Sequence, residues 1–86
     1  MAPTDTGSAA HSARPVKHSF SIRGHRTSIS LEADFWRALK EVAAAEGVPL
    51  AALVARIDQE RGEAGLSSAV RVWVLQHYRD KAAARD

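Results

Sequence analysis

The 86-residue sequence contains no cysteine. Disulfide bonds and cysteine-ligated zinc sites are therefore excluded. The sequence also lacks an apolar run near the roughly 20 residues that a membrane-spanning helix needs. No continuous apolar segment follows positive charge at the N-terminus, as it would in a secretory signal. These absences predict a cytoplasmic protein with no membrane partner.

Acidic residues are missing from the range Thr6–Leu31, which carries four cations and three histidines. The range Glu32–Asp86 carries eight cations and nine acids. Although the net charge of the chain is only +2, its N-terminal part up to Leu31 is clearly basic. Such a part suits contact with the phosphates of a nucleic acid, although solvated basic tails are also common.

Groups that carry catalysis or bind metals are scarce. The chain has no cysteine nucleophile and no glycine-rich phosphate loop, and neither Ser28 nor Ser30 has an evident base beside it. The four histidines do not pair at helical metal-ligand spacing, and His18 with His25 would supply only two ligands. We therefore expect no enzyme activity, no metal, no cofactor and no small-molecule substrate.

One short alternating stretch stands out, Arg26-Thr27-Ser28-Ile29-Ser30-Leu31. The alternation predicts a strand with one apolar face and one face that carries Arg26, Ser28 and Ser30. A lone strand needs a partner for its backbone groups. We expect a second copy of the chain to provide it, because two antiparallel strands form a ribbon that fits the DNA major groove.

The preceding segment leaves a second pairing open. In Val16–Arg23 the side chains of His18, Phe20 and Ile22 alternate with polar ones, and Gly24-His25 separates the two runs. The first run could pair with the second inside one chain, which would give a dimer a four-stranded sheet. It could instead be an arm that orders only on a partner. Residues 1–15 have no periodicity and predict a disordered arm.

Three helical patterns follow, at Ala33–Glu46, Pro49–Arg61 and Ser67–Tyr78. Glycine or proline lies at each boundary between them, where these residues end or begin helices. The third pattern is apolar over so wide an arc that we expect a second subunit to cover part of it. Residues 81–86 predict a frayed end, which leaves residues 16–80 as the folded domain.

The segment Gly24-His25-Arg26-Thr27-Ser28-Ile29-Ser30-Leu31-Glu32, followed by Phe35-Trp36, resembles small bacterial ribbon-helix-helix proteins. These belong to the superfamily of the Arc and Met repressors, and the likeness covers about residues 17 to 79. It implies an intertwined, mainly helical homodimer with a short β-ribbon. It also implies a bacterial transcriptional regulator, such as a repressor, that binds double-stranded DNA.

The third helical pattern departs from this family, whose usual unit is a strand and two helices. The pattern led by Gly65-Leu66-Ser67 looks more like the usual second helix, which presents its N-terminal amides to a DNA phosphate. The helix Pro49–Arg61 would then be an insertion. In the alternative, Pro49 begins the usual second helix, but proline has no amide to donate.

The DNA-binding hypothesis assigns roles to three sets of residues. Base contacts are expected from Arg26, Ser28 and Ser30, with Arg26 suited to a guanine. Phosphate contacts are expected from Lys17, Arg23, His25, Ser67 and Ser68. The shared dimer core is expected to comprise Thr27, Ile29, Leu31, Phe35, Leu39, Val70, Trp73 and Val74. The rival hypothesis is a protein-interaction module, or an antitoxin-like protein, that uses the same dimeric fold without DNA, because serine side chains reach only a short way toward bases.

Overall fold

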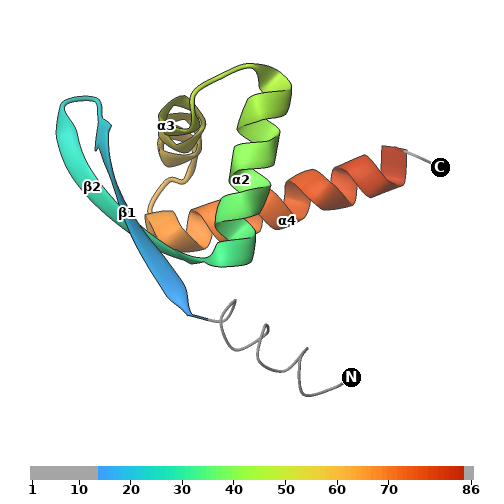
Figure 1. Ribbon diagram of the computed structural model, residues 1–86, viewed down its shortest axis with the longest axis horizontal. Coiled ribbons are helices and arrows are strands. Elements are labelled where there is room, and N and C mark those ends of the chain that lie inside the picture. The colour runs from blue at the N-terminus through green and yellow to red at the C-terminus, as the bar shows by residue number, and fades with distance from the viewer. Residues whose placement is uncertain (1–13, 85–86) are drawn as a thin grey trace.

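The computed structural model describes residues 14–84 as an antiparallel β-hairpin followed by three helices (Figure 1). The hairpin consists of β1 (Pro15–Ile22) and β2 (His25–Glu32), and the helices are α2 (Ala33–Glu46), α3 (Leu50–Glu60) and α4 (Leu66–Ala84). The predicted order of a ribbon and three helices is confirmed. Of the predicted arm, residues 1–13 lie outside the described range, whereas Pro15 already begins β1.

The strand that pairs with β2 is β1 of the same chain, with Ile22 opposite His25 and Phe20 opposite Thr27. The pairing within one chain, which the sequence left open, therefore forms, and pairing of the other edge of β2 with a second copy stays a prediction. The turn favours the hairpin, because Arg23 and Gly24 have φ angles of 50° and 82°. Two positive φ angles make a type I′ turn, whose twist matches that of antiparallel strands. The turn lies one residue earlier than the sequence suggested, so His25 belongs to β2.

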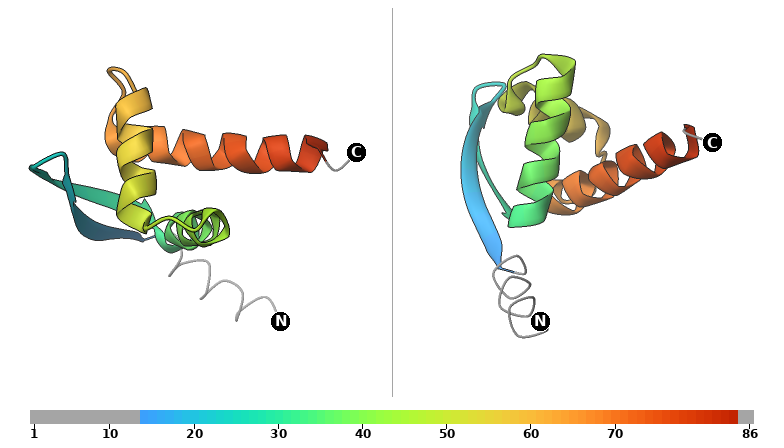
Figure 2. Two further views of the ribbon diagram at one scale, coloured as in Figure 1. Left: turned by 90° about the horizontal axis from the view of Figure 1, so that it is seen from above. Right: turned by 45° about the vertical axis from the view of Figure 1, so that its right-hand side comes forward.

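The core lies between one face of the hairpin and the three helices, which the hairpin flanks (Figure 2). Every element contributes, and the buried side chains are those of Ile22, Ile29, Leu31, Trp36, Leu39, Val42, Ala43, Leu53, Val54, Ile57, Val70 and Val74. Burying one such aliphatic side chain stabilises the fold by about 1.5–3 kcal/mol. Because these residues come from all parts of residues 22–74, the hairpin and helices depend on one another for stability.

Helix boundaries match the sequence prediction at α2 and differ at the two later helices. Pro49 is the residue before α3 rather than its first residue, and its carbonyl accepts the amides of Ala52 and Leu53. Helix α4 begins at Leu66 and continues to Ala84, so the frayed end predicted from residue 81 is wrong as far as Ala84. The reason is composition, because alanine has the highest helix propensity and Lys81 is favourable near a helix C-terminus.

Within residues 14–84, no helix combines the length and the apolar character that a membrane crossing requires.

Candidate nucleic-acid interface

The hairpin has one face toward the core and one face toward solvent. Since side chains alternate along a strand, the solvent face, here called the outer face, carries Lys17, Ser19, Ser21, Arg26, Ser28 and Ser30. Lys17 lies opposite Ser30, Ser19 opposite Ser28, and Ser21 opposite Arg26. The outer face is therefore a band of four serines with one cation toward each end.

The strand register brings these polar side chains close together. Ile22 and His25 flank a two-residue turn, so they form a hydrogen-bonded pair, and the neighbouring Ser21–Arg26 pair is a non-hydrogen-bonded one. By the same alternation the Ser19–Ser28 and Lys17–Ser30 pairs are also non-hydrogen-bonded, the type in which side chains lie closest. The hydroxyl oxygens of Ser19 and Ser28 are 3.2 Å apart. The outer face thus presents a nearly continuous row of hydroxyl groups.

The acid at the end of the outer face is neutralised by α4. Arg71 donates from Nε to Oε1 of Glu32 at 2.9 Å and from Nη2 to Oε2 at 3.2 Å. This hydrogen bonding lowers the pKa of Glu32 below its ordinary value of 4.5. Arg71 also donates to the carbonyl of Ser30 at 3.4 Å, on the outer edge of β2. The pair leaves Lys17 and Arg26 as the net charge of the outer face.

A second ion pair joins the tip of the hairpin to α3. Arg23 in the turn donates to Oδ2 of Asp58 at 2.8 Å, and Arg61 donates to Oδ1 at 2.6 Å. Both arginines lower the pKa of Asp58, Arg61 more strongly. The Arg23 side chain is still 58 % exposed, so it keeps access to an anion while Asp58 limits its position.

The predicted base-contact residues Arg26, Ser28 and Ser30 lie together on the outer face, with Lys17 directly across the hairpin from Ser30. Arg23 lies at the tip of the hairpin. His25 is opposite Ile22, on the face that turns toward the core, although its own side chain is exposed. All these positions belong to one hairpin, and their contacts with DNA stay predictions.

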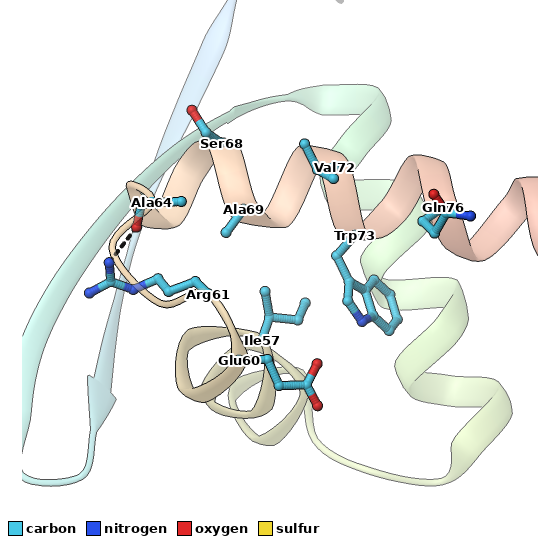
Figure 3. A pocket seen from close by; sticks show the side chains of 9 residues that line it. All are labelled: Ile57, Glu60, Arg61, Ala64, Ser68, Ala69, Val72, Trp73 and Gln76. Carbon is cyan, nitrogen blue, oxygen red and sulfur yellow. Dashed lines mark hydrogen bonds between the residues drawn. The ribbon is translucent and has the colours of Figure 1, made fainter.

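Two further predicted phosphate contacts, Ser67 and Ser68, lie at the beginning of α4 rather than on the hairpin. Ser67 is half-buried, whereas Ser68, which is labelled on α4 in Figure 3, is exposed. Two residues of the outer face, Ser19 and Ser21, were missed by sequence reasoning. The alternation of Val16–Arg23 carried that signal, but it places them on the outer face only if this run pairs with β2 inside the chain.

The residues predicted to form a shared dimer core divide into two groups. Ile29, Leu31, Leu39, Val70 and Val74 are buried by their own chain, with no more than 5 % of each exposed. Thr27, Phe35 and Trp73 are half-buried. The first group is buried within a single chain, and a shared core between two copies stays a prediction. In the part of the chain that the structure describes, no three His, Asp or Glu side chains form a group that could hold a metal ion.

Comparison with known proteins gives one family and one similar structure. The model of the family described as "Ribbon-helix-helix domain" matches residues 15–78. The chain is also similar to the solved structure of an uncharacterized protein from Bordetella pertussis Tohama I, with 33% sequence identity and a TM-score of 0.77. That likeness covers 90% of this chain and 66% of the other, so this chain spans a little under two thirds of its relative. No curated protein matches. Since the family model spans the hairpin and nearly all of the three helices, the chain belongs to the ribbon-helix-helix domain family.

Proposed function

We propose that this protein is a dimeric transcriptional regulator that binds double-stranded DNA in a sequence-specific way, with the hairpin in the major groove. Membership of the ribbon-helix-helix domain family suggests a DNA-binding regulator or a related module. The observation that carries the proposal is the outer face, on which Lys17, Arg26 and four serines share one side of a two-stranded ribbon. The role is one of binding, as expected of a repressor, and not of catalysis.

The dimensions and chemistry of the outer face fit this role. The major groove admits a two-stranded β-ribbon, and base edges there offer both donors and acceptors. Arg26 would donate to O6 and N7 of a guanine, and the hydroxyl groups of Ser28 and Ser30 would donate or accept. The Arg71–Glu32 pair supports the proposal, because it prevents a free carboxylate from repelling the DNA at the end of the ribbon.

Phosphate contacts would set the orientation on the duplex. Lys17, Arg23, His25, Ser67 and Ser68 are the proposed contacts, and the two serines would act through the beginning of α4. A homodimer would present two hairpins to two half-sites, so the operator would share the two-fold symmetry of the protein. The proposed DNA contacts and the proposed homodimer concern this chain only, because the match covers 66% of the similar protein.

A second candidate function rests on a different surface. Val72 and Leu75 of α4 are large apolar residues that are 64% and 56% exposed. A surface of this kind is typical of protein interactions. The same fold would then act as a protein-interaction module, or as an antitoxin-like protein, and the outer face would have no role in DNA binding.

The deciding experiment is fluorescence anisotropy with labelled mixed-sequence duplex DNA over a series of salt concentrations. A DNA-binding protein should lose affinity log-linearly with salt, with a slope of about −0.9 per phosphate neutralised. Operator selection from a random library would then test sequence specificity. Failure to bind duplex DNA even at low salt would contradict the proposal and favour the protein-interaction module.

A further inference from the structure

The turn of the hairpin places a charged residue where its backbone conformation is unfavourable. Arg23 has a φ of 50°, and within residues 14–84 it is the one residue other than glycine whose φ is positive. The first position of such a two-residue turn favours asparagine, aspartate or glycine, which adopt this conformation at lower cost. Since the turn itself gives no reason for an arginine, we look for the reason in its side chain.

The side chain of Arg23 is held on the helix side of the hairpin. Its Nη2 donates to Oδ2 of Asp58 on α3 at 2.8 Å. Helix α3 packs against the face of the hairpin that is turned toward the core, where Ile22 and Ile57 are buried in one cluster. The proposed base contacts lie on the opposite, outer face. The pair with Asp58 therefore keeps the guanidinium group of Arg23 away from the face that would meet DNA.

This ion pair is weak on the side of Arg23. The Arg23 side chain is 58 % exposed, and ion pairs of exposed side chains contribute little to stability because water and salt screen them. Asp58 accepts from Arg23 through Oδ2, while its Oδ1 is bound by Arg61. A phosphate has free oxygens that accept two parallel hydrogen bonds from one guanidinium group. A phosphate could therefore displace Asp58 from Arg23.

Asp58 keeps a partner when Arg23 leaves. Nε of Arg61 donates to Oδ1 of Asp58 at 2.6 Å, and Nη1 of Arg61 donates to the main-chain carbonyl of Ala64. The Asp58 side chain is only 13 % exposed, so a charge without a partner would be unfavourable there. Arg61 lowers the pKa of Asp58 more strongly than Arg23 does. The carboxylate therefore stays ionised and paired without Arg23.

We infer that Asp58 competes with DNA for Arg23. In the free chain Arg23 binds Asp58, and on duplex DNA it leaves this carboxylate for a backbone phosphate while Arg61 remains on Asp58. Asp58 thus lowers the affinity for DNA. It does so equally for all sequences, because phosphates carry no sequence information. The inference rests on the proposed DNA binding and adds an autoinhibitory contact to it.

Asp58→Asn tests the competition, with Glu60→Gln as the matched control. Both substitutions remove one negative charge from the last turn of α3, where Glu60 is exposed. Asparagine keeps the shape of the side chain and an oxygen that accepts from Arg61. Loss of an exposed ion pair corresponds to about two- to five-fold in affinity. Asp58→Asn should therefore bind mixed-sequence duplex DNA more tightly than Glu60→Gln by this factor, measured by fluorescence anisotropy, with the helicity of both variants checked by circular dichroism.

Arg23→Gln shows whether Arg23 causes the gain. In an Arg23→Gln background, Asp58→Asn and Glu60→Gln should bind DNA equally well, because no arginine is left to release. Arg23→Gln alone should reduce the slope of log affinity against log salt by about 0.9, the value of one phosphate contact. An unchanged slope, or a gain that persists without Arg23, would overturn the inference. Weaker binding by Asp58→Asn than by Glu60→Gln would also overturn it, because Asp58 would then position Arg23 for the phosphate.

The two proposals fail in different ways. If the wild type binds duplex DNA with a steep salt slope and Asp58→Asn binds no more tightly than Glu60→Gln, DNA binding stands and the competition is overturned. If no variant binds duplex DNA even at low salt, the regulator is overturned and the competition with it. A gain on the selected operator that is absent on a scrambled duplex would connect Asp58 with sequence reading and overturn the phosphate contact of Arg23.

Discussion

The indole nitrogen of Trp36 donates a hydrogen bond to the main-chain carbonyl of Val16 at 2.8 Å. The bond joins the first turn of α2 to the beginning of β1, at positions 20 residues apart. The same indole is 3 % exposed and lies edge-to-face with the His18 ring, at a centroid distance of 4.5 Å. Trp36 therefore packs β1 against the helices, on the side of the hairpin opposite the outer face.

We predict that Trp36→Phe destabilises the fold by about 1–2 kcal/mol, because it removes the donor for Val16 and some buried volume. Urea denaturation followed by circular dichroism measures the change. Trp73→Phe serves as the control and should cost less, because Trp73 is only half-buried and stacks on His77 at a centroid distance of 5.2 Å. Equal losses in the two variants would contradict the role given to the Trp36 hydrogen bond.

The Arg71–Glu32 pair predicts an acid-dependent loss of stability. The pKa of Glu32 is lower in the folded chain than its ordinary value of 4.5, so the pair stabilises the fold above that pH. This contribution is lost as the pH falls through the folded pKa. We expect Arg71→Met to have a lower free energy of unfolding than the wild type at pH 7. On acidification, the free energy of unfolding should decrease less in Arg71→Met than in the wild type.

Urea titrations at pH 7 and at several pH values below 4.5 measure this difference. Arg37→Met is the control, because Arg37 pairs with Asp34 at a surface site where both side chains are more than 60 % exposed. If Arg71→Met and the wild type lose equal stability between neutral and acidic pH, the pair does not cause the effect.

Substitution of Gly24 in the hairpin turn should destabilise the fold through backbone conformation alone. Gly24 has a φ of +82°, and no atom lies within 4 Å of the position that a β-carbon would take. Gly24→Ala should therefore destabilise the fold by about 1–2 kcal/mol through its left-handed backbone, without any steric clash. Gly24→Asn should cost less, because asparagine tolerates this region.

Gly65→Ala is the matched control for the turn. Its surroundings are equally open, and its φ lies outside the left-handed range. We expect Gly65→Ala to keep the Tm of the wild type and Gly24→Ala to have a lower Tm. The same drop in both variants would show that the φ angle of Gly24 is not the cause.

The DNA proposal makes its sharpest prediction at Arg26. Arg26→Ala should reduce affinity for the selected operator by about 1–3 kcal/mol and relax the preference at one base position. The melting temperature should not change, because Arg26 is exposed on the outer face. Anisotropy titrations on the operator and on a scrambled duplex measure both effects.

Arg37→Ala separates the role of Arg26 from general charge. It removes the same charge from the exposed side of α2, away from the outer face. We expect it to leave operator affinity within about two-fold of the wild type, as for surface substitutions outside the contact area. A similar loss at Arg26 and Arg37 would mean that charge alone is measured, and that the outer face does not read bases.

Local patterns in the sequence determined the elements and the sidedness of β2. The alternation of Arg26 to Leu31 was sufficient to separate Arg26, Ser28 and Ser30 from the buried Ile29 and Leu31. The bounds of α2 followed from helical spacing and from Gly47, whose φ of 72° ends the helix. These features depend on neighbouring residues only, so a single sequence contains the information.

Only the tertiary structure decided which strand pairs with β2 and what surrounds the outer face. Strand pairing depends on the free energy of the whole arrangement, to which the Arg23-Gly24 turn and the Trp36 contact with β1 both contribute. The Arg71–Glu32 pair spans 39 residues, and no local pattern specifies it. Local spacing was therefore sufficient to predict a ribbon with one polar face, whereas the contacts that support this ribbon required the folded chain.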